Sequence, residues 1–385
     1  MIESGTRTRT ALFAAFASLG VTAAFVPAIL PSAERAIGSD LSAAVPALFG
    51  GLLVGVLASG PLLMRRPPRT ALMLGSVLQA AAIVAVALAD APAVFIAAAA
   101  LAGFGFGLVE ASGSVSAKSA VVGSATGLLS ALLGTVAVCA AATPLLVAAA
   151  SGTRPLLVVL AAVPLLAAAM LAGPVPAAPR ADAPARRDVR GLRFLLPFAV
   201  ALPLYVGVET VLSGWSAAIP ERILEIDPGT AALGTSAFWA LMALGRFGAA
   251  TLRRLSVPPL VILASATSGA AVLIATAGML VGPAPAGALL ALGAAVVLLS
   301  PSYGLILGIA LDRLDPARSA AVTGALVACG AVGGTFVPAL ILLIGRDPAS
   351  STTFLVSAGL CALVPVLVLI SARLPARRPD ADRVT

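Results

Sequence analysis

Long apolar runs recur along the whole chain, and each can cross a lipid bilayer as a helix. The hydrocarbon core of a bilayer is about 30 Å thick, which an α-helix of about 20 residues spans. Hydrocarbon offers no hydrogen-bond partner to the backbone, so a run that crosses it must be helical. We expect twelve crossings, near Ala11–Leu30, Leu41–Met64, Thr70–Leu88, Pro92–Ser116, Ser124–Ala149, Pro155–Leu171, Phe194–Ala217, Thr230–Leu252, Pro258–Leu280, Ala284–Leu311, Ala320–Ile344 and Ser351–Ala372.

Composition excludes a soluble globular protein. Charged residues make up 10% of the chain and hydrophobic residues 60%, with a mean hydropathy of +1.09. Soluble domains carry about 25% charged residues. The first apolar run follows Arg7 and Arg9, as in a secretory signal peptide. It is longer than the apolar region of such a signal and eleven further runs follow, so we expect a retained helix.

The positive charges alternate between the two sides of the predicted bundle. With the N-terminus inside, the inner segments hold 20 of the 24 lysines and arginines, and only Arg35, Arg154, Arg222 and Arg346 lie outside. This bias is typical of membrane proteins and predicts that both termini are cytoplasmic. The charges form no continuous face, so we expect no nucleic-acid partner. The arginine- and alanine-rich composition suggests a bacterial inner membrane.

The chain divides into two predicted domains of six helices each. Residues 174–191 are rich in proline, alanine and arginine without apolar periodicity, as in a cytoplasmic linker. The domains would comprise residues 1–173 and residues 192–385, the second ending in a short cytoplasmic tail. Both contain the pattern G-x-x-x-x-R-R, beginning at Gly60 and at Gly248. This weak repeat is typical of transporters built from two parallel six-helix units.

Motifs in four helices resemble those of the major facilitator superfamily. In the loop after the second run, Gly60, Leu62, Arg65 and Arg69 match the family pattern G-x-L-x-D-R-x-G-R-R/K, whereas Met64 and Pro67 depart from it. Three stretches are similar to the fucose-permease-like group. They are Gly103-Phe-Gly-Phe-Gly-Leu-Val-Glu110, Tyr205-Val-Gly-Val-Glu209 with Gly214-Trp215, and Phe238-Trp239 with Gly245-Arg246.

The resemblance implies an all-α membrane protein of two six-helix bundles that works by alternating access. It implies that Glu110 occupies the place of a proton-binding carboxylate in the fourth helix. It also assigns Gly60, Arg65, Arg69 and Arg246 to conformational change. The acid that sugar carriers hold in the first helix has no counterpart around Thr22.

Glu110 and Glu209 are the only carboxylates well inside a predicted crossing. A charge at mid-membrane costs at least about 2.5–3.5 kcal/mol, so such residues are functional candidates. Removal from water favours the neutral acid, which suits a group that loads and releases a proton. The alternative is that each acid merely pairs with an arginine. A structural role in a salt bridge is favoured for Arg246.

Five further residues are candidates for a substrate cavity, and two other features predict local structure. Tyr205 and Tyr303 could line the cavity or serve in packing, and the other candidates are Trp239, Thr22 and Ser114. Trp215 has the position of an interfacial anchor. Ser300-Pro301 predicts a bend in the tenth crossing.

These features predict a secondary transporter of a small organic molecule. The chain has no histidine and no ATP-hydrolysing motif, so we expect no metal, no cofactor and no enzymatic activity. Few amides and aromatics beside two acids favour proton-coupled efflux of an amphiphilic or cationic compound. Proton-coupled uptake of a sugar-like metabolite and passive facilitation remain open. We expect a monomer whose partners are lipid, substrate and protons.

Overall fold

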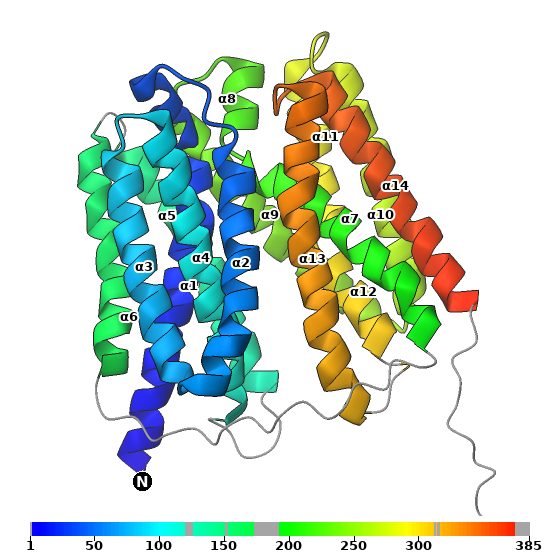
Figure 1. Ribbon diagram of the computed structural model, residues 1–385. Helices are drawn as coiled ribbons and strands as arrows, with labels where there is room; N and C mark the ends of the chain where they lie inside the picture. The colour runs from blue at the N-terminus through cyan, green and yellow to red at the C-terminus, as the bar shows by residue number, and fades with distance from the viewer. Residues whose placement is uncertain are drawn as a thin grey trace, which may run out of the picture.

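The computed structural model describes residues 2–119, 126–150, 153–172, 192–311, 313 and 316–373 (Figure 1). Within them the chain is helical. The helices of the first half are α1 (Ile2–Ile37), α2 (Ala44–Arg65), α3 (Pro68–Leu88), α4 (Pro92–Ser119), α5 (Thr126–Ala149), η1 (Arg154–Ala161) and α6 (Ala162–Ala172). Those of the second half are η2 (Leu192–Leu195), α7 (Leu196–Gly214), α8 (Ala218–Leu224), α9 (Pro228–Arg254), α10 (Pro259–Leu280), α11 (Pro285–Leu299), α12 (Ser302–Leu311), α13 (Pro316–Gly345) and α14 (Ser351–Arg373).

Prolines set the starts of many of these helices. Six helices, namely α3, α4, α9, α10, α11 and α13, begin at a proline. Proline suits the first helical position because it lacks only an N–H that would be unpaired there anyway. The glycines Gly214 and Gly345 end α7 and α13. Short connections between crossings therefore follow from where the sequence places proline and glycine.

The expected crossings are confirmed, with local differences. Eleven helical segments of the described residues are long and apolar enough to span a membrane. The 27-residue helix α9 is not among these eleven segments. With α9 included, the number of crossings is consistent with the expected twelve. The tenth crossing breaks into α11 and α12 at Ser300 and Pro301, as the sequence predicted. The sixth begins as the 3₁₀ helix η1, and the short helix α8 was not expected.

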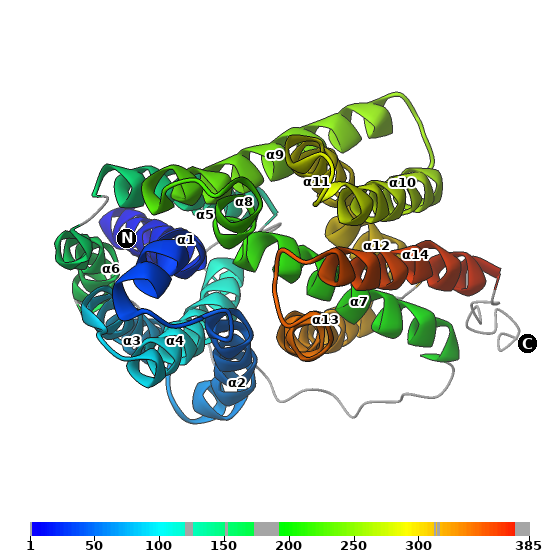
Figure 2. The same ribbon diagram turned by 90° about the horizontal axis from the view of Figure 1, so that it is seen from above.

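The helices form two bundles, one from α1 to α6 and one from α7 to α14 (Figures 1 and 2). We call these the N-half and the C-half. The N-terminal face is the side on which α1 begins, at the bottom of Figure 1, and the distal face is the opposite side, where α8 lies. The predicted linker 174–191 and the tail after 373 lie outside the described residues, so the domain boundaries stay a prediction.

Glycines let α2 and α4 approach each other very closely. A Cβ atom on Gly103 would collide with the carbonyl oxygen of Leu48, and one on Gly51 with that of Ala100. One turn further along, a Cβ on Gly55 would collide with the carbonyl oxygen of Phe104, and one on Gly107 with that of Leu52. Lipid tails are as apolar as leucine, so helices in a membrane associate through such close packing rather than through water exclusion. The Gly103-x-Gly-x-Gly107 stretch therefore holds α4 against α2 and α3.

Adding one methyl group at Gly103 should destabilise the protein. We expect Gly103→Ala to lower the melting temperature measurably in detergent, because overpacking a tight contact costs about 1–3 kcal/mol. The matched control is Gly134→Ala on α5, where a Cβ meets no atom within 4 Å. The control should melt at or slightly above the wild-type temperature, since alanine is the better helix former. Equal melting of the two variants would contradict the proposed role of this contact.

Candidate functional site

Four elements bring the candidate residues together between the halves. Glu110 lies on α4 of the N-half and Glu209 on α7 of the C-half, and both side chains are half-buried. Tyr303, at the start of α12, interacts electrostatically with both acids. The interaction between Tyr303 and Glu110 joins the two halves. The two acids that the sequence singled out therefore share one central cluster.

Two tyrosines pack at the centre of this cluster. The ring centroids of Tyr205 and Tyr303 are 6.5 Å apart with an interplanar angle of 39°. Tyr205 is only 1% exposed, and its hydroxyl makes no hydrogen bond of standard geometry with a described residue. Glu209, one helical turn further along α7, is within electrostatic range of that hydroxyl. The hydroxyl is shielded from solvent in this state, and Glu209 is the acid beside it.

Arg246 supplies the positive charge of the cluster. It lies on α9, is solvent-exposed, and interacts electrostatically with Glu209. Its Nε atom donates to the carbonyl oxygen of Ser300 at 3.5 Å, at the break between α11 and α12. The proline at position 301 interrupts the helix there, which frees the carbonyl groups of the preceding turn. Arg246 thus connects Glu209 to the bend in the tenth crossing.

Glu110 and Glu209 differ in their surroundings. Glu209 has a cation, Arg246, and a phenol, Tyr205, within range. Glu110 has no ion pair and no side-chain hydrogen bond with the part of the chain that the structure describes, and Tyr303 is its polar neighbour. The described charges of the cluster therefore sum to one negative charge when both acids are ionised. They sum to zero when one of the acids is protonated.

The other predicted cavity residues lie at several places. The Thr22 hydroxyl on α1 is buried and donates to Oε1 of Gln79 on α3 at 2.7 Å, so it takes part in packing within the N-half. Ser114 lies one turn beyond Glu110 on α4 and is half-buried. Trp239 packs edge-on against Phe238 on α9, with ring centroids 5.7 Å apart. Whether these three residues contact substrate stays a prediction.

The loop residues Gly60, Arg65 and Arg69 lie at the N-terminal face. Gly60 and Arg65 are exposed near the end of α2, and Met64, at the motif position where the family has aspartate, is 73% exposed. Arg69 donates to the backbone carbonyl of Ala172 at the end of α6, at 2.7 Å. Ala172 belongs to the same half as Arg69. The role of these residues in conformational change stays a prediction.

An ion network joins the halves at the distal face. Arg222 on α8 of the C-half contacts three carboxylates. They are Glu34 at the end of α1 at 2.9 Å, Asp40 at 3.4 Å, and Asp347 of the C-half at 2.9 Å. Its NH2 group also donates to the Ser42 hydroxyl at 3.0 Å. A second ion pair, between Arg35 and Glu221 at 3.3 Å, crosses the halves nearby.

The charges of this network shift one another's pKa values. Burial opposes the charge on Arg222, but Glu34 and Asp347 outweigh it and hold the pKa of Arg222 above its usual range. Burial also opposes the ionisation of Asp40. Hydrogen bonds from Ser42 and the charge of Arg222 outweigh that effect and hold the pKa of Asp40 below its usual range. The stability that the ionised Asp40 carboxylate adds is therefore present near neutral pH. It is lost only as the pH falls through that lowered pKa.

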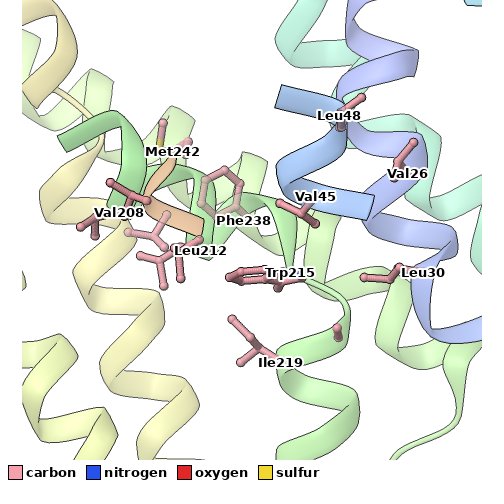
Figure 3. Close-up of a cluster of buried hydrophobic side chains, with 14 of the residues drawn as sticks. Val26, Leu30, Val45, Leu48, Val208, Leu212, Trp215, Ile219, Phe238 and Met242 are labelled. Carbon is pink, nitrogen blue, oxygen red and sulfur yellow. The ribbon is translucent and has the colours of Figure 1, made fainter. Parts of the chain in front are cut away.

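Trp215 seals the same region with apolar contacts (Figure 3). It is fully buried between Leu30 and Val45 of the N-half and Leu212 and Phe238 of the C-half. Its Nε1 donates to the carbonyl oxygen of Ser42 at 3.1 Å, across the halves. The expectation that Trp215 anchors the protein in the lipid interface is wrong, since the side chain contacts protein on all sides. It is part of the closure of the distal face.

Sequence reasoning missed the distal network because its members are far apart in the chain. Arg222 and Glu34 are 188 residues apart, and each looks like an ordinary loop charge. One signal was present, because few arginines lie on this side and acids lie close to several of them. The ion pairs of Arg35 and Arg222 with the opposite half, and the hydrogen bonds from Trp215 to Ser42 and from Ser236 to Ala141, join described residues of the two halves toward the distal face. The structure is therefore closed at that face.

Comparison with known proteins identifies the family. The sequence model of the Major Facilitator Superfamily matches residues 11–338. No curated protein matches the chain. Among solved structures, a D-xylose-proton symporter superposes with a TM-score of 0.80 at 15% identity, covering 94% of this chain and 97% of that chain. The E. coli fucose:proton symporter superposes with a TM-score of 0.64 at 16% identity, covering 95% and 98%.

A third structure supports the same fold assignment. A peptide transporter in complex with sulfate superposes with a TM-score of 0.75 at 17% identity, covering 95% of this chain and 94% of that chain. Identities this low establish a shared fold and leave the cargo open. The family match covers most of the sequence, and the twelve-helix plan agrees with it. The chain belongs to the Major Facilitator Superfamily.

Proposed function

We propose that this protein exports an amphiphilic or cationic small molecule in exchange for protons, with Glu110 as the proton-binding group. The family and the fold support secondary transport across a membrane in general. The observation that carries the finer proposal is the difference between the two central acids. Glu209 has Arg246 beside it, whereas Glu110 has no described cation.

Charge balance gives this difference a mechanistic meaning. With both acids ionised, the described cluster carries one excess negative charge in a region where an unbalanced charge is costly. A proton on Glu110 neutralises that charge, and so does a bound organic cation. The two events therefore compete for one site, which is the condition for exchange. Because Glu110 and Tyr303 belong to different halves, neutralisation also changes an interaction across the halves.

Alternating access supplies the movement in this proposal. In the closed state described above, Arg222, Glu34 and Trp215 join the halves at the distal face. Breaking those contacts would let the halves separate there while they approach each other at the N-terminal face. Protonation or cargo binding at the centre biases the two states only if each state binds the ligand with a different affinity.

Uptake of a sugar-like molecule with a proton is the second candidate. The Tyr205 hydroxyl makes no hydrogen bond of standard geometry with a described residue and could bind a cargo hydroxyl once the central cluster opens, and the Tyr303 ring packs beside the Tyr205 ring. The D-xylose-proton and fucose:proton symporters share the fold. A neutral cargo would not compete with a proton for charge, so both could be bound at once, as transport in the same direction requires. The dependence of cargo binding on pH therefore separates the two candidates.

The charge pattern supports an orientation for this cycle. Arg35, Arg154, Arg222 and Arg346 lie at the distal face, while Arg9, Arg65, Arg66 and Arg373 lie toward the N-terminal face. The latter face also receives the arginine-rich segment 174–191 in the predicted topology. We place the N-terminal face in the cytoplasm of a bacterium and both termini on that side. We also propose that one chain is the functional unit.

The first test compares metabolites inside and outside host cells with and without this gene, at two external pH values. A compound that accumulates inside cells lacking the gene identifies the cargo of an exporter. A compound that stays in the medium of those cells supports uptake instead. The identified compound then serves as the probe for transport in inside-out membrane vesicles with an imposed pH gradient.

Replacing Glu110 with glutamine should uncouple transport from the proton gradient. Glu110→Gln keeps the side-chain shape and removes the titrating group, so we expect concentrative transport to fall by about tenfold or more. Because glutamine mimics the protonated acid, exchange of labelled for unlabelled cargo at equal pH should be weakened and should lose its pH dependence. Glu225→Gln, an exposed acid between α8 and α9, is the matched control and should behave as wild type. A Glu110→Gln protein that still concentrates cargo along the proton gradient would rule out this assignment.

Removing Arg222 should open the distal face. In Arg222→Gln, Glu34 loses its cation while partly buried, and breaking such a pair costs about 2–5 kcal/mol. Spin labels at Ser39 of the N-half and Thr352 of the C-half, in a cysteine-free background, report the distance across this face. We expect the short-distance population to fall about tenfold or more in Arg222→Gln and to stay unchanged in Arg346→Gln, an exposed control at the same face. Identical distance distributions in both variants would contradict a closing role.

A further inference from the structure

A cavity lies at the distal face, separate from the central cluster. It has a volume of about 420 Å³ and is bounded by the ends of four helices. These are the end of α1, the end of α5, the start of η1 and the start of α9. The last belongs to the C-half and the others to the N-half, so the cavity exists where the two halves meet. Its volume falls within the range of small-molecule sites.

Two arginines give this cavity its charge. Arg35 and Arg154 both line it, and the one acid among its lining residues is Asp227. Asp227 precedes α9, and its Oδ1 accepts a hydrogen bond from the backbone N–H of Thr230 at 3.0 Å, so its charge caps that helix. The remaining lining is largely apolar and includes Val147, Ala150 and Leu157. The cavity thus combines a positive end with an apolar wall.

Arg154 has a donor that its structural role leaves unused. Its NH2 group donates to the carbonyl oxygens of Val86 and Ala89 at 3.3 and 2.6 Å, which ties η1 to the end of α3. Its Nε is buried and has no hydrogen-bond partner among the described residues. A guanidinium N–H left unpaired away from water costs free energy comparable to a lost hydrogen bond. Arg154 as a whole is only partly buried and lines the cavity, so its guanidinium can also meet an acceptor there.

The depth of the cavity indicates the source of that acceptor. Every wall comes from the end of a membrane-crossing helix, which places Arg35 and Arg154 at the level of the lipid headgroups. Basic pockets between helix ends at this depth are suited to anionic headgroups, whose acyl chains follow the apolar surface toward the membrane. A guanidinium can donate two parallel hydrogen bonds to a phosphate. A free anion would gain nothing from the apolar wall.

We propose that this cavity binds the phosphate of an anionic phospholipid, held by Arg154 and Arg35. Such a lipid contacts both halves, because the start of α9 closes the cavity from the C-half. It also lies next to the ion pair between Arg35 and Glu221, which crosses the halves. Bound lipid therefore stabilises the state in which the distal face is closed. The composition of the membrane thereby regulates the transport cycle.

The test measures melting of the full chain in a maltoside detergent. Dihexanoyl phosphatidylglycerol is compared with dihexanoyl phosphatidylcholine, which has the same chains and no net charge, and with inorganic phosphate at equal ionic strength. At ten times its dissociation constant, the anionic lipid should raise the melting temperature by about 2 °C. The other two compounds should cause less than a third of that shift. An equal shift with inorganic phosphate would overturn the lipid proposal in favour of a free-anion site, and an equal shift with phosphatidylcholine would overturn any role for the charge.

Variants separate a binding role of Arg154 from a purely structural one. Arg154→Gln and Arg35→Gln should each weaken the lipid-induced shift, with a dissociation constant raised about tenfold. Arg346→Gln at the same face lies outside the cavity and should keep the full shift. Ala150→Phe fills the cavity without changing any charge and should abolish the shift, which keeps the test decisive if Arg154→Gln does not fold. A full lipid-induced shift in Ala150→Phe, or in both arginine variants, would overturn the proposal.

Discussion

The absence of hydrogen-bond partners in hydrocarbon governs this structure. It forces every crossing to be helical, and it removes the hydrophobic drive that would press helices together in water. The helices must therefore associate through close contact, which glycine permits between α2 and α4. The same constraint makes each intramembrane charge expensive. The close glycine contacts and the small number of charges in the membrane both follow from the lack of hydrogen-bond partners in hydrocarbon.

The two places where charges gather follow this condition in different ways. At the distal face, Arg222 is surrounded by three carboxylates near the ends of helices, where water reaches part of the network. At the centre, Arg246 accompanies Glu209, and Glu110 has no described cation. Each of the three acids at the distal face lies within ion-pair distance of Arg222, so the contacts can hold a conformation. In the proposed function, Glu110 has no such partner among the described residues and lowers the cost of its charge by binding a proton or a cation.

The fold could be predicted from the sequence, whereas the contacts across the halves could not. Runs of about 20 apolar residues fix where helices cross, and proline and glycine fix many of their ends. Glu110 and Glu209 stood out because a buried acid is rare whatever surrounds it. Arg222 and Trp215 did not, because an arginine in a loop and a tryptophan near a helix end are ordinary until the distant partner is known. The short helix α8, which presents Arg222 to Glu34, had no periodic pattern long enough to reveal it.

The closure at the distal face combines an apolar seal with a polar lock, and the two contribute differently. Burying Trp215 favours closure without requiring one geometry, since apolar contact is non-directional. Arg222 adds direction, because its guanidinium must meet Glu34, Asp40 and the Ser42 hydroxyl together. Partly exposed ion pairs add little net stability, and the loss of one partner is what costs most. The apolar contacts thus supply most of the attraction between the halves. The arginine sets the register in which they meet, and a transporter that must reopen needs that attraction to be modest.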